Sequence, residues 1–207
     1  MNGNSIPKAT LGRLPQYLQY LRSLPKIEGS TISATVLARG LKLGEVQVRK
    51  DLASISGAGK PKIGYITSDL IIELEKCLGI NNVNSAVLVG AGKLGRALLN
   101  YNGFEEYGVK IIAAFDNDKT VVCADGIDKK IYSMDEFENF CKQNEVKLGI
   151  ITVGKNSAQE VCDKMINSGI VGVWNFAPCV LKVPSNVLLK QENLALSLAY
   201  LNNQLRN

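Results

Sequence analysis

Three glycines in one short turn are the residues whose spacing points most directly to chemistry. The pattern G-x-G-x-x-G occupies Gly90, Ala91, Gly92, Lys93, Leu94 and Gly95. An apolar strand (86–89) precedes it and a helical segment follows it. In such a turn the first glycine permits a tight bend, the second lets the backbone approach a pyrophosphate, and the third lets helix pack on strand. The turn therefore predicts a dinucleotide site at a helix N-terminus, and a glycine turn without a ligand is the alternative.

An acidic residue follows the glycines at the distance that a ribose contact requires. Residues 109–116 (VKIIAAFD) are predicted to form the next strand, and its last residue, Asp116, lies about 20 residues beyond the turn. A carboxylate at this position binds the hydroxyls of the adenosine ribose. Asn117 follows directly, and Asp118 adds a second negative charge that would repel a 2′-phosphate. We therefore expect NAD (as NADH or NAD⁺) rather than NADP.

The same part of the chain continues to alternate between strands and helices. A helix is predicted over 131–144, a strand over 147–154, a helix over 157–169 and a strand over 170–177. This alternation predicts a Rossmann-like α/β domain with a doubly wound parallel sheet over 80–186. Ligands of such sheets bind beyond the carboxyl ends of the strands. The further residues expected at the nucleotide are therefore Thr152, Val153, Asn175, Phe176, Ala177 and Pro178.

The first third of the chain carries the positive charge. The net charge is +5, but residues 1–68 contain ten Lys and Arg against three Asp and Glu, whereas residues 69–207 contain fourteen against sixteen. A basic segment joined to a slightly acidic one indicates a polyanionic partner for the first segment only. The alternative is a solvated basic surface without a partner.

Short helices are predicted throughout this basic segment. Residues 10–24 form an amphipathic pattern that Thr10 is expected to cap and Pro25 to end. The apolar face of this helix would consist of Leu14, Tyr17, Leu18 and Leu21. Ser33 is expected to cap a second short helix, which Gly40 closes.

A third helix and a glycine-rich hairpin complete the pattern of a winged helix-turn-helix over 1–79. The helix is predicted over 44–55, the hairpin, or wing, over 56–66, and a connecting helix over 68–79, capped by Ser68 or Asp69. In that fold the third helix enters the major groove and the wing touches the DNA backbone. The residues expected to contact double-stranded DNA are therefore Gln47, Arg49, Lys50 and Ser54 from the helix and Lys60 and Lys62 from the wing.

The end of the chain, 187–207, is expected to form a final helix with an apolar stripe of Leu194, Leu198 and Leu201. Nothing nearby in the sequence obviously covers this stripe. Such a helix either docks on its own domain or packs against a partner subunit.

Composition restricts the chemistry that the chain can perform. Histidine is absent, which excludes Ser-His-Asp and Cys-His catalysis, and the five cysteines form no C-x-x-C pair. We therefore expect no catalytic residues, no metal site and a protein that is not an enzyme. The chain has no secretory start and no apolar run long enough to cross a bilayer, so a cytoplasmic protein without a membrane partner is expected.

The chain contains, in this order, the segments IPKATLGRLPQYLQYL, QVRKDL, the GY of Gly64–Tyr65, GAGKLGRALLNYNGF, AAFDND, IITVG with SAQ, and WNFAP with a following VP. In these segments the chain resembles the Rex family of bacterial redox-sensing transcriptional repressors. The resemblance implies a homodimer that binds palindromic operator DNA. It implies further that NAD⁺ permits this binding and that NADH releases the protein from DNA. It also implies that the C-terminal helix is exchanged between subunits, as a domain-swapped helix near the partner's domain junction.

The resemblance further implies a redox-sensitive polar network of an arginine, a tyrosine and an aspartate. Arg13 and Tyr101 match the first two, whereas the third position is Asn193. The asparagine removes a charge that could pair with Arg13, and neighbouring Glu192 is the alternative partner. ASISGAG after RKDL and Gly154 after TV also depart from the family pattern, as in a divergent paralogue.

Two other functions fit part of the sequence. An NAD-dependent oxidoreductase would explain the glycine turn but not the basic first third. A module that binds NAD or coenzyme A without DNA would also leave the basic segment without a role, and Asp116 argues against coenzyme A. DNA binding and the identity of the bound nucleotide discriminate between these alternatives.

Overall fold

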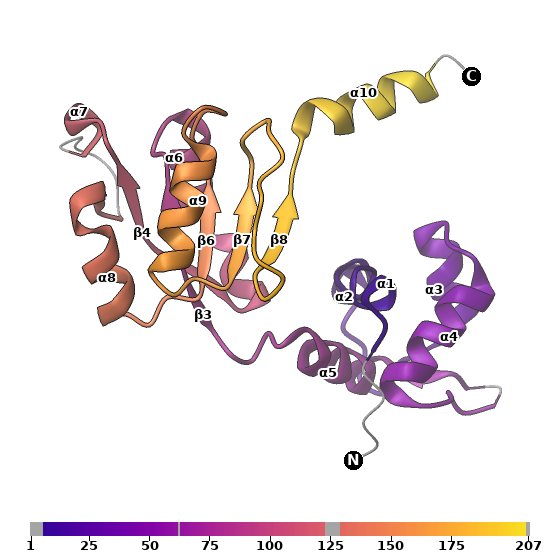
Figure 1. Ribbon diagram of the computed structural model, residues 1–207. Helices are drawn as coiled ribbons and strands as arrows, with labels where there is room; N and C mark the ends of the chain where they lie inside the picture. The colour runs from indigo at the N-terminus through magenta and orange to yellow at the C-terminus, as the bar shows by residue number, and fades with distance from the viewer. Residues whose placement is uncertain (1–5, 62, 123–128, 206–207) are drawn as a thin grey trace. The chain divides into compact units, whose positions relative to one another are not determined.

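The computed structural model describes residues 6–61, 63–122 and 129–205, and the chain forms two compact units (Figure 1). The N-terminal unit ends at Asn82 and the C-terminal unit begins at Val83. The division lies slightly beyond the predicted end at 79. The residues that follow the last helix remain part of the N-terminal unit, because the Ile80 N–H donates to the Glu75 carbonyl (3.1 Å) and the Ile80 side chain packs on the helical core.

The N-terminal unit combines helices with a short antiparallel sheet. Its helices are α1 (Lys8–Leu11), α2 (Leu14–Ser23), α3 (Ala34–Leu41), α4 (Glu45–Ser56) and α5 (Thr67–Leu78), and its sheet pairs β1 (Thr31–Ile32) with β2 (Tyr65–Ile66). Apolar side chains of α2, α3, α4 and α5 form its core. The order of elements matches the predicted winged helix-turn-helix, with α4 in the place of the recognition helix.

The helix predicted over 10–24 is interrupted, which corrects the prediction. α1 ends at Leu11 and α2 begins at Leu14 because Pro15 has no N–H and its ring would collide with the Leu11 carbonyl in a continuous helix. Thr10 is therefore not a cap: it is buried at the end of α1. The predicted apolar face is confirmed, since α2 buries Leu14, Tyr17, Leu18 and Leu21.

The helix ends follow the sequence signals only in part. Ser33 caps α3 as predicted, because its hydroxyl accepts from the Val36 N–H at 3.2 Å. Gly40 does not end α3: the helix continues to Leu41, and Lys42 takes the left-handed conformation at φ 53°. A Cβ on Gly40 would overlap the Tyr20 ring, so this glycine permits close packing of α3 on α2.

The connecting helix α5 also follows the sequence signals at one end and not at the other. Its end at Gly79, with φ 68°, is as predicted. Its start is not, because α5 begins at Thr67 and no side chain caps it, so neither Ser68 nor Asp69 has that role.

Backbone hydrogen bonds hold the wing at its base. Lys60 and Gly64 exchange backbone hydrogen bonds of 2.8 Å, and β2 then pairs with β1. Gly64 has φ +85°, and a Cβ at this position would overlap the Ile32 carbonyl of β1. Gly64 therefore allows the wing to approach β1.

The C-terminal unit contains a parallel sheet, which is six-stranded over the residues that the structure describes. In spatial order the strands are β5 (Ile131–Ser133), β4 (Val109–Asp116), β3 (Asn84–Val89), β6 (Leu148–Ile151), β7 (Gly172–Asn175) and β8 (Leu188–Gln191). The chain order reverses between β3 and β6, as in a doubly wound dinucleotide-binding sheet. The sheet continues to Gln191 because β8 pairs with β7, so the domain does not end at 186 as predicted.

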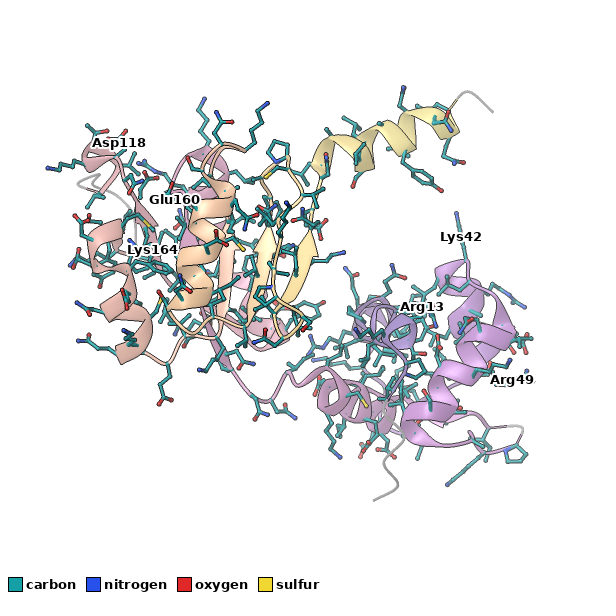
Figure 2. The ribbon with its side chains drawn as sticks, in the orientation of Figure 1. Arg13, Lys42, Arg49, Asp118, Glu160 and Lys164 are labelled. Atoms are coloured by element: carbon teal, nitrogen blue, oxygen red, sulfur yellow. The ribbon has the colours of Figure 1, made fainter. Side chains whose placement is uncertain are left out.

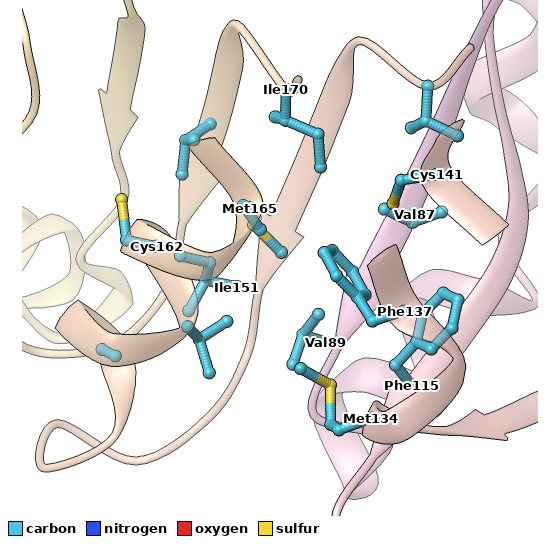
Figure 3. Packing of buried hydrophobic residues seen from close by; sticks show 14 of the residues in the cluster. Val87, Val89, Phe115, Met134, Phe137, Cys141, Ile151, Cys162, Met165 and Ile170 are labelled. Atoms are coloured by element: carbon cyan, nitrogen blue, oxygen red, sulfur yellow. The ribbon is translucent and has the colours of Figure 1, made fainter. Parts of the chain in front are cut away.

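The two faces of this sheet are covered differently. Alternate residues of β3 point to opposite faces, so Val87 and Val89 meet α8 (Phe137–Gln143) and α9 (Ala158–Asn167), as Figure 3 shows. Ala86 and Leu88 face the other side, with Leu99 of α6. The remaining elements are α6 (Lys93–Leu99), η1 (Asn102–Tyr107), α7 (Lys119–Val122), η2 (Met134–Glu136) and α10 (Leu194–Gln204).

Two cysteines belong to the core between the sheet and α8 and α9. Cys141 and Cys162 are free thiols, and burial raises the pKa of Cys141 to about 11 and also raises the pKa of Cys162. Among the helices described, none is both long and apolar enough to cross a bilayer.

Gly64→Ala is expected to destabilise the N-terminal unit by about 2–4 kcal/mol, because the methyl group adds a backbone clash to the cost of a positive φ. Gly79→Ala is the matched control: Gly79 also has positive φ, but nothing lies within 4 Å of its Cβ position, so about 1–2 kcal/mol is expected. Urea unfolding followed by circular dichroism measures both. Equal losses would show that the Ile32 contact is not restrictive.

Candidate nucleotide site and nucleic-acid interface

The glycine turn between β3 and α6 is crowded at its ends and open in the middle. The Gly90 N–H donates to the Phe115 carbonyl (2.8 Å), and a Cβ on Gly90, at φ +102°, would lie 2.8 Å from the Thr152 backbone. A Cβ on Gly95 would overlap the Gly90 carbonyl, whereas Gly92 has nothing within 4 Å of its Cβ position. The turn therefore leaves its free space at Gly92, where a phosphate would approach the backbone.

Thr152 closes this turn from the neighbouring strand. Its N–H donates to the Val89 carbonyl (2.9 Å) and its hydroxyl to the Gly90 carbonyl (2.6 Å). Val153 lies against Gly90 as well. Both residues thus lie at the reversal point of the sheet beside the turn, where the sequence predicts them.

Asp116 is held against the glycine turn by backbone N–H groups. Its Oδ2 accepts from the Ala91 N–H (2.7 Å) and its Oδ1 from the Asp118 N–H (2.9 Å). Each carboxylate oxygen keeps a further lone pair for a hydroxyl donor. Hydrogen bonds from Thr120 lower the pKa of the exposed Asp118, so two negative charges lie at this edge of the sheet (Asp118 is labelled in Figure 2). Asn117, between them, is exposed.

The loop after β7 lies beside the residues that follow β6, and a buried side chain determines its conformation. Asn175 pairs with Ile151 in the sheet, so the residues that follow each strand emerge side by side. The Asn175 side chain is fully buried: its Nδ2 donates to Gln191 Oε1 (2.7 Å) and its Oδ1 accepts from the Ala177 N–H (3.0 Å). Asn175 therefore shapes this loop through its side chain, and its contact with the nucleotide stays a prediction.

The remaining residues of this edge differ in exposure. Ala177 is buried, Phe176 is half-buried and Pro178 is exposed. Lys93 and Leu94, at the start of α6, are also exposed. Gly92 is the N-cap of α6 and supplies no side-chain hydrogen bond, so the first N–H groups of the helix face the turn without a side-chain cap. Within the ranges described, no group of three metal-ligating side chains comes together.

The outward side of α4 holds most of the residues expected to contact DNA. Lys50 is exposed, and Arg49, also exposed and labelled in Figure 2, pairs with Glu45 one turn earlier. Gln47 and Ser54 both bond to Asp51: Gln47 Nε2 donates to the carboxylate (3.0 Å), and the Ser54 hydroxyl donates to the carbonyl (2.6 Å).

The wing contributes to the same surface. Lys60 is exposed and lines, with Arg49, a groove of about 520 Å³ between the wing and the start of α3. Thr35 and Tyr65 also line this groove. Lys62 lies outside the described residues.

Sequence reasoning missed the most connected polar group of this unit, Asp51. Its carboxylate is almost completely buried and accepts from Arg13 Nε (2.7 Å) and Nη2 (2.8 Å), the Tyr17 hydroxyl (2.7 Å) and the Thr10 hydroxyl (2.9 Å). Burial alone would raise the pKa of Asp51, but these bonds and that of Gln47 outweigh it and lower the pKa to about 2. The signal was present, because Asp51 lies three residues after Val48 on the apolar stripe of α4.

The three residues implied for the redox network have other partners within the chain. Arg13, in the N-terminal unit, pairs with Asp51, a partner that the sequence analysis did not identify. Asn193 caps α10, since its Oδ1 accepts from the Leu196 N–H at 3.0 Å. Tyr101 is exposed, with its ring edge-on to Phe104 at 4.9 Å.

Glu192, the alternative partner considered for Arg13, is engaged inside the C-terminal unit. It accepts from Trp174 Nε1 at 3.3 Å and pairs with Lys190 at 3.5 Å.

Comparison with known proteins identifies both parts of the chain. Residues 5–53 match the family model "Putative DNA-binding protein N-terminus", and residues 81–179 match "CoA binding domain". The redox-sensing transcriptional repressor Rex of Carboxydothermus hydrogenoformans is 38% identical over 206 residues, which are 100% of this chain and 99% of that protein. The chain belongs to the Rex family.

Other Rex proteins cover the chain almost as fully. Rex of Clostridioides difficile is 38% identical over 96% of the chain and 95% of its own length, and Rex of Bacteroides thetaiotaomicron is 34% identical over 97% and 91%. A crystal structure of RSP in complex with β-NAD⁺ and operator DNA superposes with a TM-score of 0.89 at 32% identity, covering 98% of this chain and 93% of that one. RSP in complex with β-NADH gives 0.87 at 31% identity, over 98% and 95%. The predicted Rex fold, a DNA-binding domain followed by a Rossmann-like domain, is confirmed.

Arg13→Ala is expected to lower the free energy of unfolding of the N-terminal unit by about 3 kcal/mol near pH 7, because Asp51 would stay buried without its cation. The folded pKa of Asp51 lies below its unfolded value, so its contribution is present above the unfolded pKa and is lost as pH falls toward about 2. The difference between wild type and variant should therefore shrink below about pH 4. Urea unfolding at neutral and acidic pH measures this difference.

Arg22→Ala, near the other end of α2, is the control. Its pair with Glu75 is partly exposed, so a loss of about 0–1 kcal/mol is expected. A loss for Arg13→Ala that is no larger, or that does not vary with pH, would contradict the assigned role of the Asp51 pair.

Proposed function

We propose that this Rex-family chain is a transcriptional repressor that senses the NADH/NAD⁺ redox state and releases operator DNA when NADH binds. One observation carries the proposal, namely that a single chain contains both kinds of site. Its C-terminal unit has the open glycine turn with Asp116 hydrogen-bonded to it, and its N-terminal unit exposes Arg49 on α4 and Lys60 on the wing. The Rex relatives, and the RSP complexes with NAD⁺, NADH and operator DNA, support both halves. The repressor would act in the cytoplasm and perform no catalysis of its own.

The nucleotide would lie along the carboxyl edge of the sheet. Its pyrophosphate would approach the backbone at Gly92 and the N-terminus of α6, because Gly92 is where the turn is open. Asp116, already oriented by Ala91, would accept from the ribose hydroxyls, and Asn117 lies beside it. The segments 152–153 and 176–178 would flank the other end of the ligand, since they follow the adjacent strands β6 and β7.

Operator DNA would bind to the outward side of α4 and to the wing. Lys50 and Arg49 project from α4, where phosphates and base edges of a major groove would lie, and Lys60 would reach the DNA backbone. A repressor that binds as a two-fold dimer presents two such helices to a palindrome.

The C-terminal helix supports a homodimer. α10 contains no charged residue, and its leucines are exposed, among them Leu194 at 61%, Leu198 at 66% and Leu201 at 58%. A helix with apolar side chains on more than one side is normally buried, so the exposed surface of α10 requires a covering partner. We assign its cover to a second copy of this chain, in which α10 would enter an apolar groove of the C-terminal unit.

That groove lies on the sheet face opposite α8 and α9. It measures about 470 Å³, and Phe104, Tyr107, Leu148, Trp174 and Leu188 line it. Leu188, on the outer strand β8, is 73% exposed. An apolar helix and an apolar groove on the same chain satisfy each other in a symmetric dimer.

NADH would act by favouring one arrangement of the two units over another. It shifts this equilibrium only by its differential affinity for the two arrangements, and typical couplings of this kind change affinity about 5- to 150-fold. Coenzyme A, named in the matching domain model, is the competing ligand. It is distinguished by what the purified protein binds.

Operator duplex selected from randomised DNA by the NAD⁺-loaded protein should lose affinity about 5- to 150-fold when NADH replaces NAD⁺. Gly92→Val should abolish this response, because its side chain fills the phosphate position, while Ala97→Val on the exposed side of α6 should retain it. Titration by fluorescence anisotropy, with NADH binding measured by calorimetry, provides both readouts. A Gly92→Val protein that binds NADH as tightly as wild type would contradict the placement, and a response to coenzyme A alone would contradict the function.

Leu198→Glu and Leu188→Glu should each shift the protein from dimer to monomer. Each buried leucine contributes about 1.5–3 kcal/mol and occurs twice in a two-fold interface, so the dissociation constant should rise by about two to four orders of magnitude. Asn202→Glu, a charge at a polar position of α10, is the control and should remain dimeric. Sedimentation equilibrium measures all three, and three identical dimers would exclude this interface.

A further inference from the structure

A buried carboxylate accepts a hydrogen bond from an exposed amide on α4. Asp51 Oδ1 accepts from Gln47 Nε2 at 3.0 Å, one turn earlier on α4, while Arg13, Tyr17 and Thr10 hold the same carboxylate from behind. Gln47 itself is exposed and lies in the first turn of α4. This is the part of a recognition helix whose side chains reach base edges.

The hydrogen bond to Asp51 determines the orientation of the Gln47 amide, that is, which of its two polar groups faces the carboxylate. An ionised carboxylate only accepts hydrogen bonds, so it must face the NH₂ group of Gln47 and not the carbonyl. The carbonyl oxygen is repelled by the same charge and therefore turns away from it. The hydrogen donated to Asp51 is thus the one on the far side of the nitrogen from Oε1. The outer edge of the amide then presents Oε1 as an acceptor beside the second N–H as a donor.

We propose that Asp51 positions Gln47 to read an adenine in the operator. Oε1 would accept from adenine N6 and the free N–H of Gln47 would donate to adenine N7, which is the pairing that a glutamine makes with this base in the major groove. Guanine and thymine present acceptors, O6 and O4, where Oε1 would need a donor. Asp51 is a positioning residue, because it acts through Gln47. The inference rests on the proposed function, since it concerns the same DNA surface.

Selection from randomised duplex DNA by the NAD⁺-loaded full-length chain tests the inference. Wild type should enrich a motif with one adenine per half-site whose replacement costs about 5- to 150-fold in affinity. Gln47→Leu should reduce that discrimination to about twofold while the other positions keep theirs. Asp51→Asn should also relax it, because an amide at position 51 can face Gln47 with either oxygen or nitrogen and lets Gln47 flip.

Tyr17→Phe is the matched control for loss of stability. It removes one hydrogen bond from the same carboxylate without touching Gln47, so it should keep the adenine preference. If Asp51 only stabilises the fold, Asp51→Asn will weaken binding to all sequences alike and leave the preference intact, which overturns the proposal.

A measurement on the DNA-free protein separates this inference from the proposed function. In ¹⁵N-resolved NMR spectra, one Gln47 side-chain amide proton should be shifted downfield and protected from exchange in wild type and Tyr17→Phe, and not in Asp51→Asn. Failure of wild type to enrich any motif contradicts the proposed function and, with it, the adenine contact. A motif that Gln47→Leu reads as wild type does, or an unshifted Gln47 amide in wild type, overturns this inference alone.

Discussion

A carboxylate removed from water in a small helical core must be matched by donors, and the N-terminal unit is arranged around this requirement. Asp51 on α4 receives hydrogen bonds from α1, from Arg13 directly before α2, from Tyr17 of α2 and from its own helix. Desolvation of an unpaired carboxylate costs several kcal/mol, so the arrangement that supplies these donors is strongly favoured. α4 therefore cannot slide or rotate on α2 without breaking the ion pair, and the basic residues on its outer side inherit that fixed orientation.

A steric constraint has the corresponding role in the C-terminal unit. The order of strands reverses between β3 and β6, and the chain must turn there without a side chain at either end of the bend. Gly90 and Gly95 meet that demand, and Thr152 ties the turn to β6. The ligand-binding edge is thus assembled from the backbone of one strand connection and the side chains that follow its neighbours.

The features that depend on local sequence patterns could be predicted from the sequence. The features that depend on contacts between residues distant in the sequence could not. The strand 109–116 has the predicted bounds, and Gly79 ends α5, because periodicity and helix-stop signals act locally. Gly40 was misassigned because its role depends on Tyr20 of another helix. The bonds of Asp51 to Arg13 and of Asn175 to Gln191 were missed for the same reason, since these partners lie outside the elements that carry Asp51 and Asn175.

The buried thiols have a consequence for a protein that responds to one redox couple. Peroxides and disulfides react with the thiolate, and burial keeps Cys141 and Cys162 protonated at physiological pH. Both lie in the core between the sheet and α8 and α9, away from the solvent that carries small oxidants. These two sulfurs are therefore poor targets for peroxides and disulfides, so the packing of this core does not depend on the oxidation of either thiol.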